Sequence, residues 1–390
     1  MRNFEIFYFD NDMGEYNEFN PRFVMGQPYI KEIISILGHN KPFSFSLKDL
    51  AIKLKINNDN LKKSINLLKN ISAIRVKKEK LSLAFPFFTS GDCKIIKKIV
   101  LKELEKIEKL FENKIVVFRK KIGELYPDID QNVSLYHLLC GKFFDGSMFD
   151  FLQKQNLLAK SFPKKDNRDY IIVGYDIDRY CKKFNSELFC SFNHARYGKS
   201  SLSSFGNAEG NRFDYFRYFK LREKQQLSKK FLKVDKDLKI YSSDEIVKRS
   251  LEVINSLYYK KPFEKDLFYF SLKRFNYINR DDQIIVPVFY NHIEKCAEFS
   301  EFAIKEIGKT VIQNMQEVKK DVLKSDISCV KHKVRIDELC NELWHIYFGL
   351  LNKFLIDKKY VAHPKHFLGE GQYLKCVYIW FYKLLYTFKW

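Results

Sequence analysis

The stretch that decides the fold class, residues 46–70, reads SLKDLAIKLKINNDNLKKSINLLKN. Apolar residues recur at helical spacing on both sides of a short break, at Leu47, Leu50, Ala51 and Leu54 and again at Leu61, Ile65 and Leu68. Ser46, followed three residues later by Asp49, forms a short version of a capping box. Because residues 55–57 leave room only for a tight turn, the sequence predicts two amphipathic helices in a helix-turn-helix.

The segments on either side extend this pattern. Residues 29–37, YIKEIISIL, place four aliphatic side chains on one helical face, and Gly38 is a typical residue for ending that helix. Residues 73–85, AIRVKKEKLSLAF, alternate apolar and polar positions around the charged tip 77–80. This pattern is typical of a two-stranded hairpin.

The order helix, helix-turn-helix, hairpin over residues 28–88 resembles the winged helix-turn-helix of bacterial transcription regulators. One position departs from that pattern, since Lys55 stands in the turn where such families often have glycine. The resemblance implies that the helix 58–70 enters the major groove of DNA and that the hairpin contacts phosphates.

Candidate DNA contacts follow from the polar side of this module. Asparagine can pair with adenine, lysine can reach guanine, and lysine or arginine can neutralise phosphates. The candidates are Lys48, Asn58, Asn60, Lys62, Lys63, Asn66, Arg75, Lys77, Lys78 and Lys80. The alternative is that these lysines are only the solvated face of a lysine-rich protein.

Charge favours a polyanionic partner. The 390 residues contain 69 Lys+Arg against 48 Asp+Glu, a net charge of +21. Residues 41–80 contain 11 basic and 3 acidic side chains, whereas residues 243–289 contain 8 and 7. We therefore expect double-stranded DNA as the partner of the first module, and a near-neutral second module.

The chain also indicates its compartment. Its eight cysteines are scattered without a C-x-x-C pair, the first residues are acidic, and no long uncharged apolar run occurs. We expect a cytoplasmic protein with reduced thiols and no membrane segment. The apolar C-terminal stretch 373–390 is interrupted by Lys375 and Lys383 and is expected to form a buried helix or strand.

Internal repeats indicate a tandem duplication of about 27–183 and 243–390. LLKNISAI (67–74) matches SLKRFNYI (271–278), LSLAFPFF (81–88) matches QIIVPVFY (283–290), and LYHLLCG (135–141) matches LWHIYFG (343–349). The predicted fold class is mainly α with small β-wings, as tandem winged-helix halves with long amphipathic helices. The predicted segments are an N-terminal extension (1–26), a basic winged helix (27–90), a long helix with a helical/β subdomain (91–193), a basic aromatic linker (194–242), a near-neutral winged helix (243–296) and a long helix with a C-terminal subdomain (297–390).

Two long amphipathic helices, 93–125 and 297–324, resemble the dimerisation helices of winged-helix regulators. They could pair within one chain as a pseudo-dimer or serve a homodimer. The third reading makes them ordinary core helices.

Other groups of residues give weaker indications of a functional site. Cys329, His332, Cys340 and His345 approach a zinc pattern, but we expect no metal or other cofactor because Cys340 and His345 also fit one helix. The matched residues His137 and His345 are more typical of hydrogen-bonded core histidines. No catalytic group can be assembled, so we expect a binding protein and no enzyme.

The leading hypothesis is a sequence-specific DNA-binding transcription regulator. One alternative is a plasmid or phage replication initiator with tandem winged helices. The other is an RNA- or protein-binding adaptor that uses the linker, where aromatic residues alternate with the candidate secondary contacts Arg212, Arg217, Lys220 and Arg222.

Overall fold

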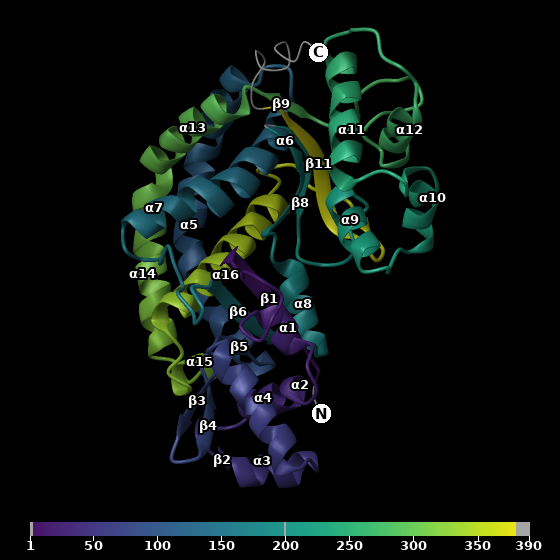
Figure 1. Ribbon diagram of the computed structural model, residues 1–390. Coiled ribbons are helices and arrows are strands. Elements are labelled where there is room, and N and C mark those ends of the chain that lie inside the picture. Colours follow the sequence, from purple (N-terminus) through teal and green to yellow (C-terminus); the bar gives the residue numbers. More distant parts are fainter. Residues whose placement is uncertain (1–2, 199, 380–390) are drawn as a thin grey trace. The chain divides into compact units, whose positions relative to one another are not determined.

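A computed structural model describes residues 3–198 and 200–379 (Figure 1). Helices make up about 55% of it and strands 16%, in three small sheets. The protein is therefore a mixed α/β structure with substantial helix. No described helix is both long and apolar enough to cross a membrane.

The described residues form two compact units. Unit 1 contains residues 3–108, 149–185 and 310–347, and unit 2 contains residues 109–148, 186–309 and 348–379. Neither unit is a continuous stretch of chain, whereas the segments predicted from the sequence follow one another along it.

Unit 1 combines helices with two sheets. Its helices are α1 (Pro21–Met25), α2 (Ile30–Gly38), α3 (Leu47–Leu54), α4 (Asn58–Asn70), α7 (Met148–Lys154), α8 (Arg179–Glu187), α14 (Lys309–Leu323) and α15 (Ser328–Lys331), with the first parts of α5 (Ser90–Leu125) and α16 (Ile336–Asp357). Its strands are β1 (Phe4–Asp12), β2 (Phe45–Ser46), β3 (Ile74–Lys77), β4 (Lys80–Leu83), β5 (Phe87–Phe88) and β6 (Asp169–Asp176).

The two sheets of unit 1 share a core with α2 and α4. In one sheet, β6 lies between β1, to which it is antiparallel, and β5, to which it is parallel. In the other, β4 lies between β2 and β3 and is antiparallel to both. The apolar faces of α2 and α4 pack with residues of both sheets, among them Ile33, Leu68, Leu81 and Ile172. Strand β6, which is distant in sequence, thus contributes to the core on which the helix-turn-helix packs.

Unit 2 contains one larger sheet and the remaining helices. Its helices are α6 (Gln131–Leu135), η1 (Tyr136–Ser147, a π-helix), α9 (Tyr215–Glu223), α10 (Lys229–Leu238), α11 (Ser243–Tyr258), α12 (Leu267–Arg274), α13 (His292–Ala303) and η2 (Ile304–Gly308, a π-helix), with the later parts of α5 and α16. Its strands are β7 (Ser191–Tyr197), β8 (Ser200–Gly206), β9 (Val288–Tyr290), β10 (His366–Phe367) and β11 (Gly371–Ile379).

In this sheet, β11 lies between β8, to which it is antiparallel, and β9, to which it is parallel. The opposite edge of β8 is paired with β7. Strand β11 is the part of the apolar C-terminal stretch that the structure describes, and it is buried over most of its length. Residues 380–390 of that stretch lie outside the described residues.

The expected linker 194–242 is not a linker. Its first part forms strands β7 and β8, and its second part forms helices α9 and α10. The serine-rich strand β8 is buried because its hydroxyls find partners: Ser201 and Ser203 lie 2.9 Å apart, and Ser204 donates to Asp214 at 2.6 Å. A composition typical of a loop is here compatible with a central strand.

The predicted long helices are present. Helix α5 spans residues 90–125, and α13, η2 and α14 follow one another over residues 292–323. The apolar stripe of α5 is already used inside the units, since Val100, Ile107, Phe111 and Phe118 are fully buried. The two long helices also contact each other within the chain, through the ion pairs Lys102–Asp321, Lys114–Glu306 and Lys121–Glu298. The structure therefore agrees with pairing of the two helices inside one chain and leaves the apolar stripe of α5 unavailable for a homodimer.

Candidate nucleic-acid interface

The helix-turn-helix of unit 1 forms where its local sequence predicts. The Ser46 hydroxyl accepts from the Asp49 amide at 3.2 Å, and the Asp49 carboxylate accepts from the Ser46 amide at 2.8 Å. This capping box starts α3, and the hydrogen bonds from Ser46 hold the pKa of the Asp49 carboxyl below its ordinary value.

The turn between α3 and α4 has the geometry that glycine would favour, but lysine occupies it. Lys55 ends α3 in the left-handed conformation, with φ of 55°. Asn57 then caps α4, because its side-chain oxygen accepts from the Asn60 amide at 2.8 Å. Lysine at position 55 is therefore compatible with the tight turn between α3 and α4.

Helix α4 has one face in the core and one face in solvent. Leu61, Ile65 and Leu68 are buried, and the Ser64 hydroxyl bonds to the carbonyls of Asn60 and Pro28 at 3.0 and 3.3 Å. Sequence reasoning missed the contact of Ser64 with Pro28, which fixes α4 against the chain entering α2. The helix therefore has a defined rotation about its axis.

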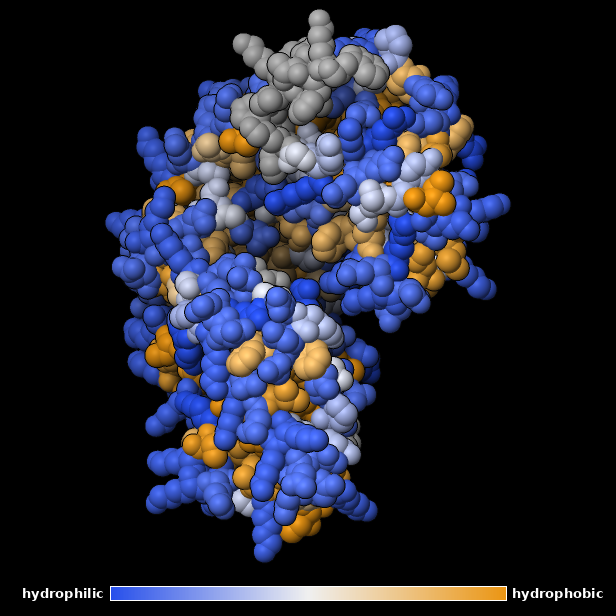
Figure 2. Space-filling view, in the orientation of Figure 1, coloured by the Kyte–Doolittle hydropathy of each residue, from blue (hydrophilic) through white to orange (hydrophobic). Residues whose placement is uncertain are grey.

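That rotation exposes most of the candidate base-reading residues. Asn58, Lys62, Lys63 and Asn66 of α4 are exposed, and Asn60 is half-buried. Lys48 of α3 is exposed as well. In Figure 2, the surface over α3, α4 and the hairpin is mostly hydrophilic. These residues form the surface that we call the α4 face.

The hairpin β3–β4 adds further exposed cations. Lys77 pairs with Lys80 across the last register position, and Lys78 and Glu79 form the connecting turn with φ of 47° and 59°. Positive φ at both central residues is the signature of a type I′ turn, whose twist suits a tight hairpin. Lys77, Lys78 and Lys80 are exposed and lie together at the tip.

Arg75 differs from the other predicted phosphate contacts. Its guanidinium donates to the carbonyls of Lys333 at 2.9 Å and Leu83 at 3.3 Å, and burial lowers its pKa. It joins β3 to the segment after α15 within unit 1. Sequence reasoning could not find this role, because Lys333 lies far along the chain.

The zinc pattern is dispersed among structural contacts. His332 accepts from the Leu83 amide through Nδ1 at 3.2 Å and lies 3.0 Å from the Asn40 carbonyl through Nε2. His345 lies 2.9 Å from the Asn341 carbonyl and faces the ring of Phe9. Burial lowers the pKa of His345 to about 4. Cys329 and Cys340 are buried free thiols, and no group of three potential ligands that could hold a metal occurs among the described residues.

His137 is a core residue of unit 2, but it is not hydrogen-bonded as predicted. Among the described residues neither ring nitrogen has a partner, and the ring contacts Tyr136 and Phe289. Burial lowers its pKa to about 3, so the imidazole is neutral near pH 7.

Of the four predicted secondary contacts of the linker, one is buried, two are half-buried and one is exposed. Arg212 is 1% exposed and donates to the carbonyls of Ser191 and Asn207. Arg222 donates to the carbonyls of Lys239 and Tyr241, Arg217 is half-buried, and Lys220 alone of the four is exposed. Of the aromatic side chains expected to stack on unpaired bases, Phe213, Tyr215 and Tyr218 belong to the core of unit 2. Phe219 is partly buried against that core, and Phe216 is exposed.

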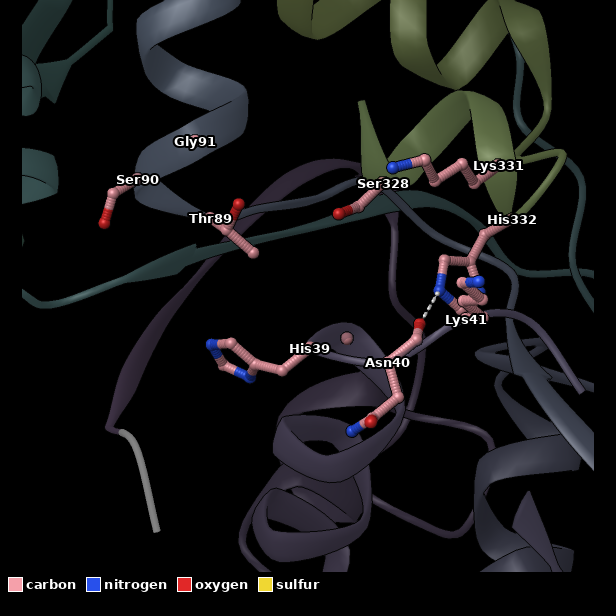
Figure 3. A pocket seen from close by; sticks show the side chains of 10 residues that line it. His39, Asn40, Lys41, Thr89, Ser90, Gly91, Ser328, Lys331 and His332 are labelled. Atoms are coloured by element: carbon pink, nitrogen blue, oxygen red, sulfur yellow. Dashed lines mark hydrogen bonds between the residues drawn. The ribbon is translucent and has the colours of Figure 1, made fainter. Parts of the chain in front are cut away.

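Unit 1 also contains a surface pocket of about 320 Å³ at the start of α5 (Figure 3). Its lining residues are Gly38, His39, Asn40, Lys41, Thr89, Ser90, Gly91, Ser328, Lys331 and His332. Several of its polar groups already have protein partners. Lys331 pairs with Asp326 at 2.8 Å, and Ser90 donates to Asp178.

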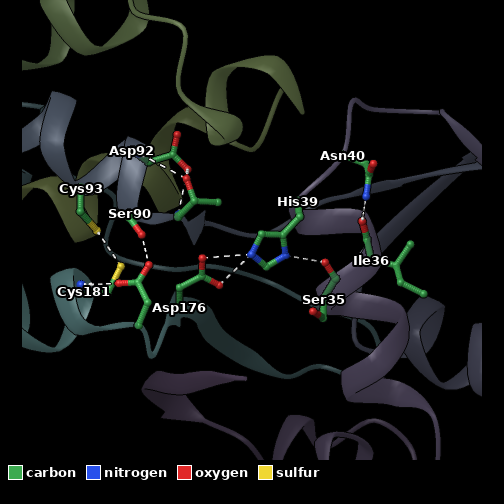
Figure 4. Close-up of polar contacts among 11 residues, drawn as sticks. Ser35, Ile36, His39, Asn40, Ser90, Asp92, Cys93, Asp176 and Cys181 are labelled. Atoms are coloured by element: carbon green, nitrogen blue, oxygen red, sulfur yellow. Dashed lines mark hydrogen bonds and ion pairs between the residues drawn. The ribbon is translucent and has the colours of Figure 1, made fainter. Parts of the chain in front are cut away.

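The contacts behind this pocket hold the start of α5 to its neighbours (Figure 4). His39 pairs with the buried Asp176 of β6 at 2.9 Å. Asp92 accepts from the Thr89 amide and from the Ser328 amide, each at 2.9 Å. These contacts join α2, β6, α5 and α15, which is a structural role.

Comparison of the chain with protein-family models, with curated proteins and with solved structures finds no match.

Proposed function

We propose that this protein binds double-stranded DNA through unit 1, with α4 in the major groove and the hairpin β3–β4 on the neighbouring phosphates. In this proposal the module is a winged helix-turn-helix, and the protein regulates transcription from the site that it occupies. The observation that carries the proposal is the α4 face, where amide and ammonium groups stand exposed on a helix whose rotation is fixed.

The pairing state of the cations supports this assignment. Among the described residues, Lys62 and Lys63 have no ion pair with a carboxylate. By contrast, the cations around α12 in unit 2 are engaged: Lys265 and Lys273 both bind Asp282, Arg274 binds Asp237, and Arg249 binds Asp266. Free ammonium groups can exchange counterions for phosphates without first breaking an ion pair.

The test is duplex selection followed by matched variants. Enrichment of one motif from a random duplex pool at near-physiological salt is the expected result for the wild-type protein. Lys62→Ala with Lys63→Ala should abolish the sequence-specific component, whereas Lys265→Ala with Lys273→Ala should leave it unchanged. Equal loss in both double variants, or no enrichment by a folded wild type, would exclude this interface.

A second candidate function, a replication initiator with tandem winged helices, is favoured by matching local structure in the two units. We infer that the chain is a tandem duplication. After α4, Ser72 has φ of 55° and the Ala73 amide bonds to Leu68 at 2.9 Å. After α12, Asn276 has φ of 55° and the Tyr277 amide bonds to Leu272 at 2.9 Å.

The strands that follow support the same inference. The Pro86 carbonyl accepts from Gly174 of β6, and β5 then runs parallel to β6. The Pro287 carbonyl accepts from Val377 of β11, and β9 then runs parallel to β11. In each unit the central strand is antiparallel to its other neighbour, β1 or β8.

The length of DNA protected from nuclease separates the two candidates. A regulator that uses unit 1 alone should protect one or two helical turns. An initiator that docks both modules on repeated sites should protect several, and it should lose part of that protection in the Lys265→Ala, Lys273→Ala variant.

A further inference from the structure

The outer edge of β1 is an unpaired strand edge in unit 1. In its sheet, β1 bonds to β6 on one side along residues 4–12. Among the described residues, no other backbone hydrogen bond reaches the main chain of residues 4–9. The strand therefore leaves the N–H and C=O groups of one edge without a main-chain partner.

The sheet of unit 2 shows which kind of partner can pair with such an edge. Strand β8 has the same relation to β11 that β1 has to β6, and its outer edge is covered antiparallel by β7 over seven register pairs, Ser191–Gly206 to Tyr197–Ser200. The plan of the sheet thus has a place for an antiparallel strand at this edge. In unit 1 the described residues leave that place unfilled.

The sequence of β1 lacks the usual protection of an exposed edge. Natural edge strands carry lysine, proline or an early bulge that discourages pairing. Residues 4–9, FEIFYF, contain no lysine, arginine, proline or glycine, and the irregularity in register comes only at Asp10/Asp12. Phe7 is 37% exposed. Five of the six residues are strong β-formers, and the sixth, Glu5, carries the single charge.

We propose that β1 pairs antiparallel with β1 of a second copy of this chain, so that the protein is a homodimer joined through a continuous sheet. Two antiparallel copies of one strand are related by a two-fold axis, which closes the assembly at two chains. In registers centred on Ile6, Phe7 or Tyr8, Glu5 lies opposite Phe7, Phe9 or Asn11, so no like charges meet. Phe7 of each chain then becomes buried where the two β1 strands pair.

The proposal goes beyond DNA binding and stands independently of it, because β1 contributes no residue to the α4 face. A homodimer through α5 is disfavoured, because the apolar stripe of that helix is buried within the units, whereas the outer edge of β1 is open.

Sedimentation equilibrium of the full chain tests the pairing. We expect a wild-type dimer, an increase of about tenfold or more in its dissociation constant for Phe7→Lys, and little change for Leu101→Lys. Leu101 is the matched control because it is 43% exposed on α5 of the same unit, and α5 is not part of the sheet that contains β1.

Hydrogen exchange gives a second measurement that does not depend on the stability of a variant. In the wild-type dimer, alternate amides of residues 4–9 should exchange more slowly at high protein concentration than at low concentration. A wild type that stays monomeric to about 100 μM, or a Phe7→Lys variant as dimeric as the wild type, would overturn the proposal.

Discussion

Glu342 is a buried carboxyl group whose surroundings change its ionisation, with a measurable effect on stability. It is buried on α16, where the Tyr175 hydroxyl donates to one carboxyl oxygen and the other has no partner among the described residues. Burial raises its pKa from 4.5 to about 8. At neutral pH the folded protein therefore keeps a proton that the unfolded chain has released.

The sign of the pH dependence follows from this difference. Between about pH 4.5 and pH 8 the folded state binds more protons at this group than the unfolded state, so the free energy of unfolding falls as pH rises, by about 1.4 kcal/mol per unit at most. Glu342→Gln should remove this slope and raise stability most at pH 8. Urea denaturation at pH 6 and pH 8 measures it, and an unchanged difference between the two pH values would contradict the assignment.

Lys55 stores backbone strain at the turn. An L-residue in the left-handed region costs about 1–2 kcal/mol, and glycine relieves this cost but adds about 0.5–1 kcal/mol of unfolded-state entropy. We expect Lys55→Gly to raise the free energy of unfolding by about 0.5–1 kcal/mol. Lys53→Gly, inside α3, is the control and should lower it, because glycine there weakens a regular helix.

At the scale of residues, local spacing was enough to predict which side chains of a helix are exposed, but it could not predict contacts with distant segments. The faces of α4 follow from the positions of its leucines and isoleucine, so the exposure of Lys62 and Asn66 could be foreseen. Arg75 and Arg212 could not be placed, because their carbonyl partners belong to segments that no local pattern connects to them. From the sequence these arginines were expected to face a nucleic acid, but the tertiary structure shows that they donate hydrogen bonds to backbone carbonyls of the protein.

The hairpin β3–β4 is an element whose stability and charge can be separated. Its type I′ turn is formed by Lys78 and Glu79, although Asn-Gly is the preferred pair for such turns. Replacing both by Asn-Gly should stabilise unit 1 by about 0.5–1 kcal/mol, because neither new residue is strained at positive φ.

The same replacement removes one cation, Lys78, and one anion, Glu79, so the net charge of the tip is unchanged and DNA binding should weaken only through the loss of a direct contact between Lys78 and phosphate. Thermal unfolding measures the first effect, and titration with the selected duplex measures the second. If affinity rises together with stability, Lys78 does not contact phosphate.

Helix α4 itself depends on the core beneath it. Leu68 is fully buried, and Leu68→Ala should lower the free energy of unfolding by about 2–5 kcal/mol through loss of burial and creation of a cavity. Asn66→Ala, two residues away on the exposed side, should change stability by less than about 0.5 kcal/mol but reduce duplex affinity. Chemical denaturation and duplex titration of the two variants separate the packing side of the helix from its proposed reading side.

At the scale of elements, the sequence predicted helices and hairpins better than the central sheet of unit 2. The periodicity of α3, α4 and α5 is strong enough to mark them without any tertiary information. Strand β8 is rich in serine, and its burial depends on β7, β11 and Asp214, so its own residues predict a loop. The elements that were missed are those whose polar groups are satisfied by other elements.

For the whole molecule, the proposed interface predicts a steep dependence of DNA affinity on salt. Six exposed cations lie on or beside the α4 face and the hairpin, at Lys48, Lys62, Lys63, Lys77, Lys78 and Lys80. If all six contact phosphate, the slope of log affinity against log salt should be about −5.

A slope of this size means that affinity should fall by about 10³-fold between 50 and 200 mM salt. Filter binding over this range measures it. The Lys265→Ala, Lys273→Ala variant should keep the same slope. A wild-type slope near zero would rule out phosphate contacts by these lysines.

The interleaving of the chain between its two units has a consequence for synthesis. Unit 1 needs residues 310–347 as well as residues 3–108, so the carbonyl of Lys333 that receives Arg75 is translated long after the helix-turn-helix has left the ribosome. Part of the apolar surface of nascent residues 3–108 therefore stays uncovered until residues 310–347 have been made. Chaperone capture during translation should accordingly persist until the ribosome has passed residue 347 and cease soon afterwards.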